Sequence, residues 1–269
     1  NSERRGGLLT DPEAQRSAGI CFVHLTNRHI DWRPENNSLY QTSMYHVFDY
    51  TRRHGYSYLR VVDTSGTAYR PGSGKAYLHG VWSKAKHLQR VLAMFELVVL
   101  VDIGDVFFPD LNKPFTDMLQ EWQYDSETTL VIGYTDPRVY FKVQSNNFTD
   151  YNCAPDEMNT GFMVFRNHPK VHRLLHEWYS CRDPLLRVGE PVDDLCTGFN
   201  PGNPAVPNWL TQPVWNVLIR PQFLAGELLV LSCEFVGNGP LDTYCTGKHV
   251  WHRMYDKYKP SKKGILEKE

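Results

Sequence analysis

The sequence predicts an α/β fold: one domain built on a central, mostly parallel mixed sheet that is flanked by helices. Strand-like and helix-like patterns alternate through the first half of the 269 residues, and this alternation implies parallel βαβ units. The run Leu97–Val101 is wholly apolar, which is typical of a buried strand. Neither an internal repeat nor a linker divides the chain. We therefore expect a disordered or stem-like leader at 1–18, one domain at 19–260 and a polar tail at 261–269.

The first half of the chain supplies three predicted strands and two helices. "GICFVHLTN" (19–27) predicts a short buried strand, and "SYLRVVD" and "LVVLVD" predict two more. "SLYQTSMYHVFDYTRRHGY" predicts an amphipathic helix that ends at Gly55, because glycine accepts the left-handed conformation that closes a helix. "VWSKAKHLQRVLAMF" predicts a second helix, since Ala85, Leu88 and Leu92 recur at near-helical spacing.

The second half continues with less regular alternation. "TTLVIGY" (128–134), "TGFMVFRN" (160–167) and "ELLVLSCEF" predict strands, "HPKVHRLLHEWYS" and "QPVWNVLI" predict helices, and "HVWHRMYDKY" is a closing segment. Residues 183–210 are rich in Pro, Gly and Asn and too long for an ordinary connection, so they predict a functional, lid-like loop.

Composition and cysteine content limit the classes of function. A net charge of −1 and a pI near 6.9 give no basic field for nucleic acid or anionic lipid. No apolar run reaches the length of a membrane span and no signal peptide opens the chain. The chain starts at Asn1 rather than Met, so we expect membrane contact only through a type II anchor outside this sequence.

The cysteines and two glycosylation sequons favour an oxidising, secretory compartment, with the Golgi lumen as the expected location. The sequons begin at Asn36 and Asn147. None of the six cysteines forms a C-x-x-C pair, which argues against a zinc ribbon or a thioredoxin-type site. Cys181/Cys196 and Cys233/Cys245 are the expected disulfides because each pair flanks a short loop, although six cysteines allow 15 pairings.

Two aspartates follow the apolar run of the third strand. Asp102 comes directly after Leu97–Val101, and Asp105 follows three residues later. In parallel sheets ligands bind at the carboxyl ends of the strands, and two carboxylates there can hold Mg²⁺ or Mn²⁺ together with diphosphate oxygens. Such an ion neutralises charge on a leaving diphosphate. The alternative is structural: Asp105 caps a turn, and Asp102 pairs with a nearby lysine.

Five segments, distributed over most of 19–259, resemble the GT-A glycosyltransferases, and one of them is the helix end "YTRRHGYSY". "LVVLVDIGDVFF" is similar to their aspartate metal motif, with D-x-x-D in place of the usual D-x-D. "GVWSKAKHLQRVL", "EMNTGFMVFRNHPKVHRLLHEWYSC" and "CTGKHVWHRMYDKYK" resemble segments of fungal Golgi α-galactosyl- and α-mannosyltransferases. The resemblance implies a Rossmann-like GT-A domain, Mn²⁺ (or Mg²⁺) and a nucleotide-sugar donor.

The resemblance also assigns a metal site. It implies that Asp105 is the principal metal ligand, that Asp102 faces the metal or the ribose, and that His252 is the third protein ligand. His249 is the alternative to His252. The two histidines lie an odd number of residues apart in one extended segment, so we expect only one of them to point inward.

The remaining predicted roles concern the donor, the acceptor and the base. The resemblance places the nucleoside at Thr26 and Asn27. We expect Lys84 to reach the donor from its helix and Lys257 to contact phosphate. The alternatives are an exposed helix lysine at 84 and a solvated lysine-rich tail at 257. Asn159 is expected near the donor sugar. Asp156 and Glu157 are candidates for acceptor binding or for the general base. Gln212 is a further catalytic candidate, and Asp193 and Asp194 in the long loop are reserve candidates.

The sequence therefore predicts a metal-dependent transferase that moves a sugar from a nucleotide diphosphate to a hydroxyl of a glycan or glycosylated acceptor. UDP-sugar is the first expected donor and GDP-mannose the second. Retention of anomeric configuration is implied by the resemblance. The alternatives are an inverting transferase of the same fold, with Asp156, Glu157 or a loop aspartate as base, and an inactive nucleotide- or carbohydrate-binding homologue.

Overall fold

The computed structural model describes residues 19–26, 39–63, 83–102, 106–135, 158–180, 215–237 and 246–252. In chain order the elements are β1 (Ile20–Thr26), α1 (Leu39–His54), β2 (Ser57–Val62), α2 (Ser83–Leu92), β3 (Leu97–Val101), β4 (Val106–Phe107), α3 (Phe115–Glu121), β5 (Val131–Thr135), β6 (Met158–Arg166), α5 (Pro169–Ser180), the π-helical turn η4 (Trp215–Ile219), the 3-10 turn η5 (Arg220–Gln222), β7 (Leu228–Leu231), β8 (Val236–Gly237) and β9 (Val250–His252).

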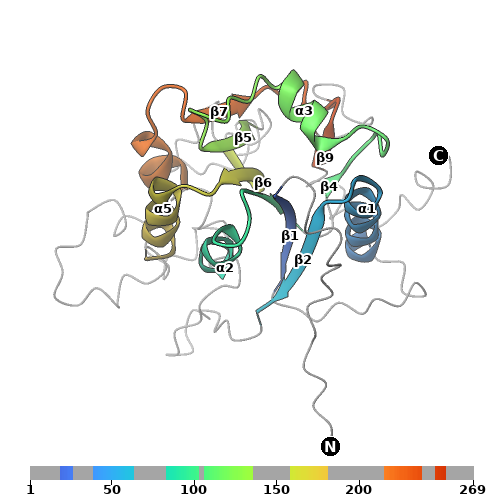
Figure 1. The fold of residues 1–269 in the computed structure, drawn as a ribbon, viewed down its shortest axis with the longest axis horizontal. Helices are drawn as coiled ribbons and strands as arrows, with labels where there is room; N and C mark the ends of the chain where they lie inside the picture. Colours follow the sequence, from blue (N-terminus) through green and yellow to red (C-terminus); the bar gives the residue numbers. More distant parts are fainter. Residues whose placement is uncertain are drawn as a thin grey trace, which may run out of the picture.

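The main sheet has six strands in the order β2-β1-β3-β6-β5-β7 (Figure 1). β1 runs parallel to both β2 and β3, and β5 runs parallel to β7. β6 is antiparallel to its two neighbours, β3 and β5. The expected architecture, a central and mostly parallel mixed sheet flanked by helices, is therefore confirmed.

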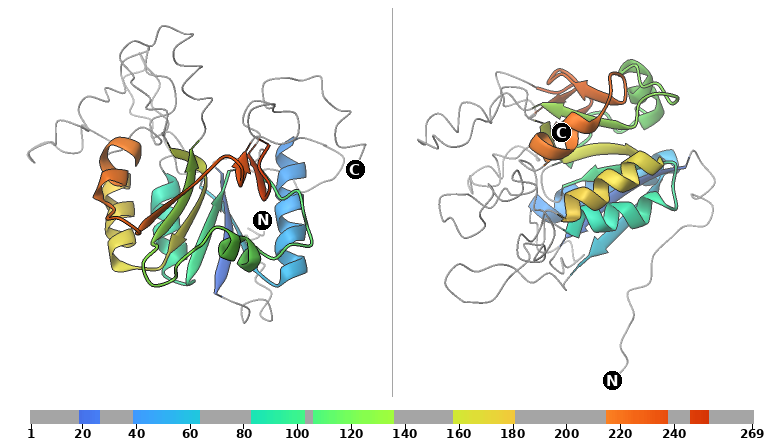
Figure 2. Two further views of the ribbon diagram at one scale, coloured as in Figure 1. Left: turned by 90° about the horizontal axis from the view of Figure 1, so that it is seen from above. Right: turned by 90° about the vertical axis from the view of Figure 1, so that its left-hand side faces the viewer.

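Helices cover both faces of this sheet, as the end-on view shows (Figure 2). Cys21 and Val23 of β1 pack with α2, α5 and η4 on one face. Ile20 and Phe22, the alternate residues of the same strand, pack with α1 and α3 on the other. Because β1 is buried on both faces, it needs the continuous apolar run that the sequence shows.

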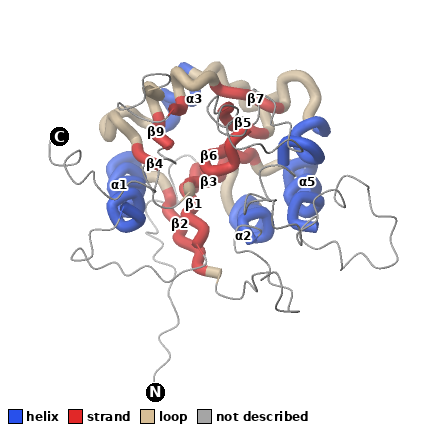
Figure 3. The backbone as a smooth tube through the Cα atoms, turned by 180° about the vertical axis from the view of Figure 1, so that it is seen from behind, coloured by secondary structure: helices blue, strands red, loops and turns tan. Residues whose placement is uncertain are grey.

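A second, three-stranded sheet lies beside α1 (Figure 3). Its order is β4-β9-β8, with β9 antiparallel to β4 and parallel to β8. Sequence reasoning did not predict this sheet. The predicted strand "ELLVLSCEF" is confirmed over Leu228–Leu231, which form β7 of the main sheet, and β8 follows the predicted segment at Val236–Gly237. α3 was also missed.

Several local predictions are confirmed. α1 ends at His54, and Gly55 has the predicted left-handed backbone, with φ of 68°. Tyr56 N–H then donates to the Thr51 carbonyl at 2.9 Å, which satisfies a carbonyl of the last turn. "QPVWNVLI" is helical where it is described, as η4. No helix in the described ranges is both long enough and apolar enough to cross a membrane.

The described cysteines are in different states. Cys21 is a free thiol, fully buried in β1, and this burial raises its pKa. Cys233 is disulfide-bonded, with a partner outside the described residues. The predicted pairings Cys181/Cys196 and Cys233/Cys245 both include cysteines outside those residues, so they stay predictions.

Candidate functional site

Three strand ends of the main sheet place polar groups at one edge. β3 and β5 run in the same direction, so their carboxyl ends share this edge, and antiparallel β6 begins there. Asp102 follows β3, and its backbone N–H donates to the Gly161 carbonyl of β6 at 2.7 Å. Tyr134 of β5 pairs in register with Asn159 of β6. This is the edge where α/β sheets bind ligands.

An ion pair joins α2 to the end of β3. Lys84 Nζ donates to Asp102 Oδ1. The lysine side chain is only 10% exposed, and the aspartate side chain is 27% exposed. Lys84 lies in the first turn of α2, where the helix dipole disfavours a cation, and the Asp102 carboxylate supplies the compensating charge. The alternative of an exposed helix lysine is therefore wrong, and the alternative that Asp102 pairs with a nearby lysine is confirmed.

His252 of β9 is buried against the same strand ends. Its Nδ1 is hydrogen-bonded to the Tyr134 hydroxyl. On its other side the ring lies against Gly161, where an added Cβ would come within 2.5 Å of both Cε1 and Nε2. Glycine at 161 thus keeps room beside the imidazole that any other residue would fill.

Asn159 and Asn216 organise the start of β6. Asn159 is 1% exposed, and its Oδ1 accepts the Gly161 N–H at 2.7 Å. Asn216 of η4 accepts the Met158 N–H through Oδ1 at 2.8 Å and donates through Nδ2 to the Met158 carbonyl at 2.9 Å. A single side chain therefore fixes both polar groups of the residue that opens the strand.

His249 belongs to a different cluster. Its Nδ1 accepts the Trp122 indole N–H at 2.8 Å, and its Nε2 lies 2.9 Å from a Glu121 oxygen and 3.2 Å from Lys113 Nζ. Burial, and then the nearby Lys113 charge, lower the pKa of His249. The expectation that only one histidine points inward was wrong, because both are buried. His249 precedes β9, so strand alternation does not relate it to His252.

The described residues thus bring together Lys84, Asp102, Asn159 and His252 among the predicted site residues. Thr26 ends β1, with its carbonyl accepting the Asp63 N–H at 2.8 Å. The other predicted site residues lie outside the described ranges, and their roles stay predictions: Asn27, Asp105, Asp156, Glu157, Gln212 and Lys257. The lid-like loop and its reserve aspartates, Asp193 and Asp194, also lie outside.

Sequence reasoning assigned no role to three residues of this site. Tyr134 could have been found as a polar residue near the carboxyl end of a predicted strand. Gly161 lies in the N-T-G-F segment but attracts attention only when His252 is seen to rest on it. Asn216 meets Met158 across 58 residues of sequence, and no local pattern signals this contact.

The donor chemistry of these residues fits a divalent cation through His252. Imidazole nitrogen and carboxylate oxygen both suit Mn²⁺, and a metal-bound imidazole commonly donates its other N–H to a fixed oxygen, as Nδ1 can to Tyr134. Asp102 fits less well, because Lys84 already neutralises its carboxylate. The described parts of the chain contain no group of three metal-binding side chains, and Asp105 lies outside them.

No protein-family profile and no curated protein sequence matches the chain. Among solved structures, it is similar to a glycosyltransferase involved in glycosylation of the major capsid of PBCV-1, with 14% identity, coverage of 81% of this chain and 83% of the other, and a TM-score of 0.47.

An active-site mutant of LgtC is similar at 11% identity, with coverage of 87% of this chain and 86% of the other and a TM-score of 0.43. The galactosyltransferase LgtC in complex with donor and acceptor sugar analogues has 13% identity, coverage of 61% and 66%, and a TM-score of 0.33. Structural similarities with TM-scores this low do not establish the function of this chain.

Proposed function

We propose that this chain is a GT-A glycosyltransferase that transfers a sugar from a nucleotide diphosphate to a hydroxyl of a glycan or glycosylated acceptor. The observation that carries the proposal is the meeting of the Lys84–Asp102 ion pair with His252 at the ligand-binding edge of the sheet. The sequence motifs that resemble GT-A enzymes supply the residues that meet there. The secretory pathway is the proposed location.

Each residue has a proposed part in holding the donor. Thr26 and Asn27 contact the nucleoside, and Asp102 binds the ribose. Lys84 and Lys257 contact the diphosphate as cations. Asp105 and His252 hold Mn²⁺ or Mg²⁺, which when bound supplies positive charge to the leaving diphosphate.

The reaction proposed is transfer with retention, in which positioning and charge stabilisation do most of the catalytic work. Asn159 is the residue proposed nearest the donor sugar, and Gln212 is proposed to lie close by. Asp156 or Glu157 binds the acceptor, and in an inverting mechanism one of them is the base. UDP-sugar is the first donor proposed and GDP-mannose the second.

Thermal unfolding with and without ligands tests donor binding. A true donor stabilises the native state by about 2.7 kcal/mol at one hundred times its dissociation constant. We expect UDP or its sugars to raise the midpoint in the presence of Mn²⁺, and GDP and GDP-mannose to have less effect. If no nucleotide raises the midpoint with Mn²⁺ present, the proposal fails.

Two lysines on one helix provide a matched pair of variants. Lys84→Met removes the cation from the site, whereas Lys86→Met removes the same charge two residues along α2, where Nζ lies 6.0 Å from the centre of the Tyr179 ring. The nucleotide-dependent shift, measured against each variant's own ligand-free midpoint, should shrink for Lys84→Met only. An equal shrinkage in both variants would indicate a general electrostatic effect rather than a site.

Product analysis tests catalysis itself. Asp105→Ala should abolish nucleotide release from the sugar donor while leaving the unfolding midpoint without ligand unchanged. The anomeric configuration of the product, read by NMR, separates retention from inversion. Nucleotide binding without any turnover would favour the inactive binding homologue.

A further inference from the structure

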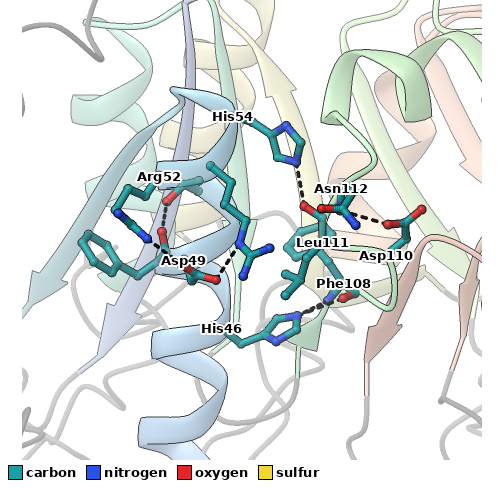
Figure 4. Close-up of polar contacts among 11 residues, drawn as sticks. His46, Asp49, Arg52, His54, Phe108, Asp110, Leu111 and Asn112 are labelled. Atoms are coloured by element: carbon teal, nitrogen blue, oxygen red, sulfur yellow. Dashed lines mark hydrogen bonds and ion pairs between the residues drawn. The ribbon is translucent and has the colours of Figure 1, made fainter. Parts of the chain in front are cut away.

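One face of α1 is hydrogen-bonded to the backbone of residues 106–113, and Figure 4 shows the contacts of His46 with Phe108 and of His54 with Leu111. Ser43, His46, Tyr50 and His54 are spaced by three, four and four residues along the helix, so they lie on one face. Each forms a hydrogen bond with a backbone group of this segment. This segment begins with β4, the strand that pairs with β9.

The four contacts divide into two pairs along the segment. At its start, Ser43 Oγ donates to the Val106 carbonyl at 3.0 Å, and the Phe108 N–H donates to His46 Nε2 at 2.9 Å. Farther along, His54 Nε2 donates to the Leu111 carbonyl at 2.9 Å, and the Tyr50 hydroxyl donates to the Lys113 carbonyl at 2.9 Å.

The first pair acts on the strand that holds His252. Val106 is the residue of β4 that pairs in register with His252 of β9. His46 also packs edge-on against Phe107, with ring centroids 5.3 Å apart. The backbone position of His252 is therefore set, one strand away, by the contacts that Ser43 and His46 make with β4.

We propose that Ser43 and His46 are positioning residues for His252, so that α1 fixes where this imidazole meets the bound metal. The inference rests on the proposed function. Groups hydrogen-bonded to a metal ligand typically change metal affinity by about 10–100-fold when they are removed, and Ser43 and His46 act one strand farther from the metal. Tyr50 and His54 stabilise the same segment at positions that do not pair with β9.

Ser43→Ala and Tyr50→Phe are matched variants. Each removes one hydroxyl from a fully buried side chain of α1, and each leaves one backbone carbonyl of the segment without that donor. The measurement is thermal unfolding with saturating UDP over a range of Mn²⁺ concentrations. We expect Ser43→Ala to raise the half-saturating Mn²⁺ concentration about tenfold and Tyr50→Phe to leave it unchanged, while both lower the ligand-free midpoint.

A second pair of variants covers the case in which Ser43→Ala does not fold. His46→Gln keeps an amide near the position of Nε2, and His46→Leu removes all hydrogen bonding. The half-saturating Mn²⁺ concentration should stay near the original value in His46→Gln and rise in His46→Leu.

The outcomes separate the inference from the function on which it rests. Equal Mn²⁺ responses in Ser43→Ala and Tyr50→Phe, or in His46→Gln and His46→Leu, overturn the positioning role while leaving the glycosyltransferase proposal intact. If the unaltered protein shows no Mn²⁺-dependent stabilisation with any nucleotide, both are overturned.

Discussion

Replacing Gly161 with alanine should displace His252 and reduce the turnover that depends on Mn²⁺. Gly161 lies in β6, between Asn159 and the ring of His252. The added Cβ would lie 2.5 Å from Cε1 and Nε2 of the imidazole and 3.0 Å from Asn159 Oδ1. Because the ring is held by Tyr134 and by strand pairing with Val106, it has little freedom to turn away.

The size of the effect follows from these distances. Carbon atoms in ordinary contact are about 3.5–4.0 Å apart, so the ring must move by about 1 Å. Overpacking of this kind costs about 1–3 kcal/mol of unfolding free energy. A shift of about 1 Å at a reacting site lowers a rate by roughly 100-fold. We therefore expect a modest loss of stability and a large loss of Mn²⁺-dependent turnover.

Gly133→Ala is the matched control. Its Cβ would overlap Met158 Cε, but this methyl group is the far end of a flexible side chain, and the next atoms lie at 3.8 and 3.9 Å. Urea unfolding gives the stability of each variant, and nucleotide release gives its activity. If Gly161→Ala and Gly133→Ala lose the same activity at equal stability, displacement of His252 does not lower turnover and the reasoning is wrong.

Three further predictions concern titratable groups. Cys21 should resist alkylation at pH 8 in the native protein and react only on unfolding, as mass spectrometry of its peptide will show, because burial raises its pKa. Burial and Lys113 lower the pKa of His249, so the free energy of unfolding should fall as pH drops below about 6.5, the ordinary pKa of histidine. In His249→Gln the free energy of unfolding, measured by urea unfolding, should change less between pH 7.5 and 5.5. Hydrogen bonds from Lys113 and Lys248 lower the pKa of Glu121 to about 2. The contribution of Glu121 to the free energy of unfolding is fully present above the ordinary pKa of 4.5 and is lost as pH falls toward 2. In Glu121→Gln the free energy of unfolding should therefore depend less on pH over this range, as acid-unfolding curves will show.

Strong local patterns made most of the main sheet predictable. β1 and β3 are largely apolar runs, β2 carries the strand-forming residues Tyr58, Val61 and Val62, and Gly55 closes α1 as its sequence indicates. The small sheet has no such signal, because β4 and β8 have two residues each and β9 has three. Strands this short show no periodicity and exist only through their partners.

The site was predictable where chemistry coincided with a strand end. Asp102 stands directly after a buried strand, so its place at the ligand edge followed from fold class alone. The Lys84 contact did not follow, because a lysine in the first turn of a helix is normally solvated. Its burial depends on α2 packing across β3, which is a tertiary effect.

The strand order of the small sheet determines when its strands can pair during synthesis. β9 is the middle strand, and it joins β4 and β8, which precede it in the sequence. A ribosome therefore releases α1 and β4 well before His252, and domains fold progressively as they emerge. We expect α1 and β4 to form an early template on which β9 docks late. A nascent chain that stops before residue 250 would lack His252 and leave β4 and β8 without their shared partner strand, so His252 joins the candidate site only after the rest of the described fold has been made.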